Sequence, residues 1–108
     1  MTQHSRRTLP AMSRSLLERR LSETTERLRT LREELVIADE QLAHLAGEAD
    51  EARLRALVSE TPLADREHHE AQKHADAMGR HRAEVASEIA RLEAHQDDLL
   101  DRLVAETR

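Results

Sequence analysis

Side chains that could bind a metal ion or transfer protons gather just past the middle of the sequence. A dinuclear metal site between helices takes a Glu-x-x-His unit from each of two helices. A single comparable unit occurs here, Asp65-x-x-His68, and we expect alanines to face it from the other helix. We therefore interpret the histidines as solvated helix side chains and keep His68, His69 and His74 as candidate metal ligands. The full group comprises Asp65, Glu67, His68, His69, Glu70, His74 and His81.

Motifs that indicate catalysis are missing from the sequence. There is no cysteine, so neither a disulfide nor a thiolate metal site can form. We also find no Gly-rich phosphate loop, no nucleophile–base pair and no zinc-ligand spacing. We therefore expect no enzymatic activity and no cofactor. A milder role stays open for His74, which we expect near Glu48, because its protonation would add an attraction between two helices and make the protein sensitive to pH.

The composition indicates long helices. Hydrophobic residues make up 38% of the 108 residues and charged residues 36%, while Phe, Trp and Tyr are absent. Aromatic side chains supply much of the buried area of ordinary globular cores, whereas a composition rich in Ala, Glu, Leu and Arg is typical of coiled coils. No apolar run approaches the roughly 18 residues that a membrane helix needs. We expect a cytoplasmic protein with no membrane partner.

The stretch Ser59-Glu60-Thr61-Pro62 predicts a turn between two helices. Thr61 is suited to cap a helix, and Pro62 to be its first residue, where its missing N–H costs nothing. The residue before a proline avoids the helical conformation, so the preceding helix should end here. We predict a helical hairpin over 12–108, with helices over about 12–58 and 62–106 and a turn at 59–62. Ser15 and Glu18 predict a capping box at the start, while Pro10 offers an earlier start, so the boundary is expected between residues 10 and 16.

Residues 1–11 are polar and aperiodic, and we expect them to form a flexible basic arm. Residues 1–20 contain five arginines and one acidic residue, whereas the chain as a whole has a formal net charge of −5. The acidic remainder argues against nonspecific DNA binding by the hairpin. We therefore expect the protein not to bind nucleic acid, except through this arm.

Apolar residues recur in alternating steps of four and three along both helical segments. This spacing predicts an all-α fold: a long antiparallel two-helix coiled-coil hairpin. Pairing the two rows about the turn brings Leu onto Leu at the open end and Ala onto Ala at the turn. It also places Thr24 against Gln96 and Arg82 against Ala38, and it brings Arg55 within reach of Glu67. The first row is Leu17, Leu21, Thr24, Leu28, Leu31, Leu35, Ala38, Leu42, Leu45, Ala49, Ala52 and Ala56; the second is Ala64, His68, Ala71, Ala75, Met78, Arg82, Val85, Ile89, Leu92, Gln96, Leu99 and Leu103.

Small and apolar residues also occur away from these rows, along one edge of the expected hairpin. An apolar strip beyond the internal contact is what a second molecule would cover. The alternative is surface alanine that serves helix propensity alone. We predict a regulatory or adaptor module that binds a protein partner and forms a homodimer, a four-helix assembly. The partner-binding edge strip comprises Val36, Ile37, Ala43, Gly79, Ala83, Ala86 and Ala90.

The expected architecture resembles that of helical hairpin factors that reach into RNA polymerase with an acidic tip. Glu60 and Asp65 make the tip of this hairpin acidic. The architecture is also similar to two-helix anti-sigma hairpins that clasp a cyclic dinucleotide, although no Arg- and Gln-bearing motif repeats on both helices here. These resemblances concern shape, which does not fix function. They leave as an alternative a transcription accessory or anti-sigma-like factor that acts on RNA polymerase through Glu60 and Asp65 at the tip. A histidine and carboxylate metal-binding protein is the other alternative.

Overall fold

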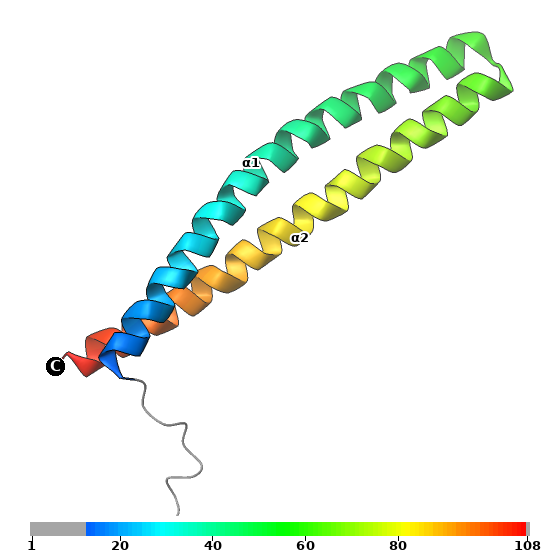
Figure 1. Ribbon diagram of the computed structural model, residues 1–108. Coiled ribbons are helices and arrows are strands. Elements are labelled where there is room, and N and C mark those ends of the chain that lie inside the picture. Colours follow the sequence, from blue (N-terminus) through cyan, green and yellow to red (C-terminus); the bar gives the residue numbers. More distant parts are fainter. Residues whose placement is uncertain (1–12, 108) are drawn as a thin grey trace, which may run out of the picture.

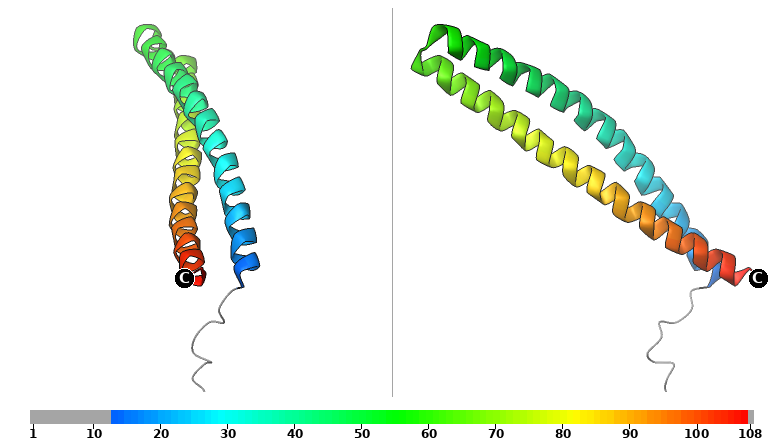
Figure 2. Two further views of the ribbon diagram at one scale, coloured as in Figure 1. Left: turned by 90° about the vertical axis from the view of Figure 1, so that its left-hand side faces the viewer. Right: turned by 180° about the vertical axis from the view of Figure 1, so that it is seen from behind.

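The computed structural model describes residues 13–107, which form two helices joined by a tight turn. Helix α1 spans Arg14–Ser59 and α2 spans Pro62–Glu106, and the two lie side by side in opposite directions (Figures 1 and 2). At 1.5 Å per residue, α1 with 46 residues is about 69 Å long and α2 with 45 residues is about 68 Å long. The predicted all-α helical hairpin is confirmed. The expected basic arm, residues 1–11, lies outside the described residues. Neither described helix contains a stretch apolar enough to cross a membrane.

The turn consists of two residues with different backbone conformations. Glu60 adopts the left-handed conformation, with φ 52° and ψ 39°, and its N–H donates to the carbonyl oxygen of Ala56 at 3.0 Å. Thr61 is extended and precedes Pro62, the first residue of α2. The Thr61 hydroxyl accepts a hydrogen bond from the N–H of Ala64 at 3.1 Å. The predicted cap at Thr61 and the predicted start at Pro62 are confirmed. The left-handed residue is a glutamate in a position where glycine is the usual choice.

The predicted capping box at the start of α1 is wrong. Ser13, two residues earlier, caps the helix by accepting from the N–H of Leu16 at 3.2 Å. Its carbonyl oxygen also accepts the first helical hydrogen bond, from Leu17. Glu18, the expected partner of Ser15 in the box, lies 3.2 Å from Arg14 Nε instead. The earlier cap is favoured because it adds two residues to the hydrogen-bonded helix without losing a capping hydroxyl.

Every residue of the two predicted rows is buried or half-buried between the helices. The centre of the contact is a cluster of four large side chains, Leu28, Leu31, Val85 and Ile89, against which Leu35 and Leu92 pack. This cluster joins residues that the predicted pairing brings opposite one another, so the antiparallel alignment is confirmed.

The polar residues within the rows find partners that differ from those predicted. Gln96 Nε2 donates to the hydroxyl of Thr25 at 3.0 Å, whereas Thr24 donates to the carbonyl oxygen of Arg20 at 2.8 Å. Thr24 is the more buried threonine and satisfies its hydroxyl within its own helix, which leaves Gln96 free for Thr25. Arg82 reaches out of the contact, and its Nε donates to Asp39 Oδ1 at 2.6 Å.

Candidate functional site

Cross-helix ion pairs define two edges of the rod. On one, Arg32 Nη2 lies 2.8 Å from Glu93 Oε2; we name this the Arg32–Glu93 edge. On the other, the Arg27–Glu88 edge, Arg27 Nη2 lies 3.4 Å from Glu88 Oε2. All these side chains are half-exposed, so each pair contributes less than about 1 kcal/mol to stability. These ion pairs identify which residues of α1 and α2 lie on the same edge of the rod.

The predicted edge strip lies on the Arg32–Glu93 edge. Val36 is 58% exposed and follows Arg32 by one helical turn. Ala43, Ala83 and Ala90 are exposed, and Gly79 and Ala86 are half-buried. Ile37 is exposed as well, but it follows Val36 directly and so lies about 100° farther around α1, outside the strip.

Gly79 is not required by the packing of the hairpin itself. A Cβ added at this position would meet one side-chain atom, Leu42 Cδ1, at 4.0 Å, which is ordinary van der Waals contact. Alanine would therefore fit and would favour the helix by about 1 kcal/mol. The packing of α1 against α2 therefore does not account for a glycine at this position.

The tip of the hairpin is apolar as well as acidic. Glu60 and Asp65 are exposed, as the sequence predicts. They lie among four exposed aliphatic side chains, of which Leu57 is 64% and Val58 is 83% exposed. Sequence reasoning missed this group, although its signal was present as aliphatic residues off the heptad rows: Leu54, Leu57, Val58 and Leu63.

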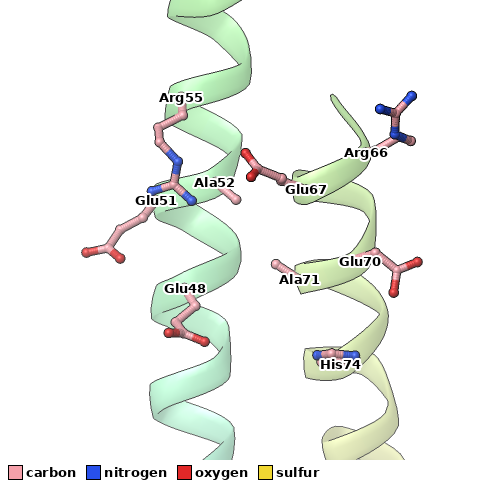
Figure 3. A pocket seen from close by; sticks show the side chains of 9 residues that line it. All are labelled: Glu48, Glu51, Ala52, Arg55, Arg66, Glu67, Glu70, Ala71 and His74. Atoms are coloured by element: carbon pink, nitrogen blue, oxygen red, sulfur yellow. The ribbon is translucent and has the colours of Figure 1, made fainter. Parts of the chain in front are cut away.

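A depression of about 600 Å³ lies between the helices near the turn (Figure 3). Ala52 and Ala71 point toward each other across it and are too short to fill it, while Glu67 points toward α1. Arg66 and Glu70 point away from it. The expected Arg55–Glu67 ion pair is not among those of the described residues, whose cross-helix pairs all involve α1 between Arg27 and Asp39. The side chains of the depression therefore do not converge on one position.

The candidate metal ligands are dispersed. His68 is half-buried at the helix contact, whereas His69 and His74 are exposed. Within residues 13–107, no three His, Asp or Glu side chains come together in a way that could hold a metal ion. His74 lines the depression together with Glu48, as expected. The histidine within ion-pair distance of Glu48 is His44, whose Nε2 lies 3.5 Å from Glu48 Oε2.

Comparison with known proteins found no matching family, no similar curated protein and no similar solved structure. The exposed surfaces therefore provide the functional argument.

Proposed function

We propose that this hairpin is a non-enzymatic interaction module that pairs with a second copy of itself and binds another protein as a regulator or adaptor. The observation that supports it most is the edge strip on the Arg32–Glu93 edge, where apolar and small side chains lie outside the contact between α1 and α2. Exposed apolar area of this kind is favourable to cover, at about 25 cal/mol per Å².

The shape of the molecule supports self-association as well. A two-helix rod has one line of contact and buries little core, so small scaffolds of this kind usually gain stability from a further partner. A catalytic role receives no comparable support, because catalysis needs side chains that converge on one substrate position, and those around the depression near the turn point in different directions (Figure 3).

The test is a pair of charges placed on the edge strip. We expect Ala83→Glu with Ala86→Glu to convert a dimer into a monomer, measured by light scattering after size-exclusion chromatography, with helicity by circular dichroism unchanged. Ser87→Glu with Ala94→Glu is the matched control, since both residues are exposed positions of α2 on its outer face. A dimer that survives the first pair as well as the control would refute the edge strip as the contact.

A second candidate function uses the tip. The observation that favours it is the exposed group of Leu57, Val58 and Leu63 beside the acidic residues Glu60 and Asp65, since a contiguous exposed apolar group marks a surface for interaction with another protein. We propose a transcription accessory that contacts RNA polymerase through this tip. Glu60→Asn with Asp65→Asn should change the activity of purified polymerase relative to the wild-type hairpin; identical activity with wild type, variant and no hairpin would refute this candidate.

A further inference from the structure

One row of α1 is complementary to itself. The row takes every seventh residue, which keeps it on one line along a helix of a coiled coil. It lies on the Arg32–Glu93 edge, because Arg29 and Val36 are three and four residues from Arg32. All six of its members are exposed: Ser22, Arg29, Val36, Ala43, Asp50 and Leu57.

The complementarity appears when the row is turned end to end about its midpoint, between Val36 and Ala43. Val36 then faces Ala43 of a second copy, a larger side chain against a smaller one. Arg29 faces Asp50, a cation against an anion. Leu57, 64% exposed in the hairpin, faces Ser22, again large against small. An isologous contact has this property, since each residue of the pair occurs twice in the interface.

The small residues of α2 lie at the same point along the rod. Arg82 reaches Asp39, and Gly79 neighbours Leu42 Cδ1, so the midpoint of the row is level with residues 79–82 of α2. A two-fold axis across the rods sets α1 against α1 and α2 against α2. Gly79 and Ala83 then lie next to the axis, where they allow the two α2 backbones to approach closely. This accounts for a glycine that the hairpin's own packing does not need.

Farther from the axis the charges of α2 are mostly compatible. His69 comes level with Glu93 of the other copy. Two like-charge approaches remain. Asp39 lies beside the axis, next to Asp39 of the other copy, and is paired with Arg82. Asp65 approaches Asp97 near the ends of the contact, where both side chains are exposed and salt screens them.

The opposite arrangement, with the axis along the rods, is less complementary. It sets α1 against α2 of the other copy at the same level, so that Arg29 lies beside Ala90 and Ala43 beside Asp76. Arg29 then loses the carboxylate that it faces in the antiparallel arrangement.

The available area is sufficient for a stable dimer. The row is about 52 Å long, and two helices are about 20 Å wide, which gives a face of roughly 1,000 Å². A standard interface covers about 800 Å² on each partner. The tip alone, with four aliphatic side chains, offers much less.

From this row we infer that the second copy packs antiparallel on the Arg32–Glu93 edge, about a two-fold axis between Val36 and Ala43. The inference rests on the proposed self-association and specifies its geometry.

A charge exchange tests the Arg29–Asp50 contact. Arg29→Glu alone, or Asp50→Arg alone, should raise the dimer dissociation constant roughly tenfold in sedimentation equilibrium, because each creates two like-charge approaches per dimer. The double variant Arg29→Glu with Asp50→Arg should restore the wild-type value. Circular dichroism controls for lost helicity, since Arg29 also pairs with Glu26 within α1 at 3.0 Å. A double variant as weak as the single ones would overturn the inference.

Disulfide trapping independently tests which residues of the two copies face each other. The sequence contains no cysteine, so every disulfide must join introduced residues. We expect a Val36→Cys variant mixed with an Ala43→Cys variant to form a disulfide-linked heterodimer on oxidation, since a disulfide requires Cα atoms within about 7 Å. A heterodimer of Val36→Cys with Ala83→Cys would indicate the arrangement with the axis along the rods. The yield of Val36→Cys with Ser87→Cys measures disulfides that form by random collision. A dominant 36–83 product, or equal yields with Ser87→Cys, would overturn the antiparallel geometry while leaving the dimer intact. A wild-type chain that is monomeric would overturn the proposed self-association as well.

Discussion

The two halves of the rod hold together in different ways. In the half toward the open end, the helices meet through large side chains, and the four that are almost completely buried, Leu17, Leu28, Leu31 and Leu99, all lie there. In the half toward the turn, the fully buried residues are alanines, the large row residues Leu42, Leu45 and Met78 are only half-buried, and four further aliphatic side chains are exposed. The list of buried alanines there is Ala49, Ala52, Ala64 and Ala75.

The open half therefore contributes most to the stability of the hairpin, whereas the turn half has exposed aliphatic side chains that another molecule can contact. A buried Leu contributes about 1.5–3 kcal/mol, and a buried methyl group near 0.8 kcal/mol. The open half therefore supplies most of the free energy that holds α1 to α2, whereas the turn half relies on the caps at Glu60 and Thr61. The exposed aliphatic residues of the turn half are then free to contact another molecule without loss to the hairpin.

The largest effect should come from truncating a leucine in the open half. Leu28→Ala should lower the free energy of unfolding by about 3 kcal/mol, because Leu28 is 0% exposed and its removal leaves a cavity. Leu54→Ala is the matched change in the turn half and should cost less than about 0.5 kcal/mol, because Leu54 is largely exposed. Urea unfolding at one protein concentration measures both, since association adds to apparent stability. Equal costs would contradict the difference between the halves.

A smaller effect is expected at the turn. Glu60→Gly should raise the free energy of unfolding by about 1 kcal/mol, because glycine adopts the left-handed conformation without the steric cost of a Cβ. Thr61→Ala should lower it by about 1 kcal/mol through loss of the cap to Ala64. Thermal unfolding of the two variants should therefore shift in opposite directions. A destabilised Glu60→Gly variant would show that the Glu60 side chain matters more than its backbone conformation.

The smallest effect is expected for the ion pair of Arg82. Asp39→Asn should cost less than about 1 kcal/mol, because both partners are about half exposed. The cost should disappear in 1 M salt, where the screening length is about 3 Å. A cost that is unchanged by salt would mean that attraction between the two charges is not what stabilises this contact.

The hairpin was predictable because its two determinants are local and periodic. The heptad rows and the Thr61-Pro62 start each follow from spacing, and each is present as predicted. The antiparallel pairing follows from them, since the short turn predicted at 59–62 leaves the two helices as antiparallel neighbours.

The polar contacts were less predictable, because a long side chain can reach partners a full turn away. Glu88, for example, lies within ion-pair distance of Arg27 on the other helix and of Arg91 on its own. Gln96 chooses Thr25 over its neighbour in the row for a similar reason. The edge strip was found because small residues at helical spacing are visible in sequence. The apolar tip is harder to predict, because Leu57 and Val58 lie in the last turn before the bend and off the heptad rows, so their exposure depends on where the helix ends.

The most direct test of this account is the molar mass of the wild-type chain in solution. A mass of twice the 12.4 kDa of one chain, which falls to that of a single chain on substitution of Ala83 and Ala86 by Glu, is the predicted result. A mass of one chain at every concentration tested would contradict it.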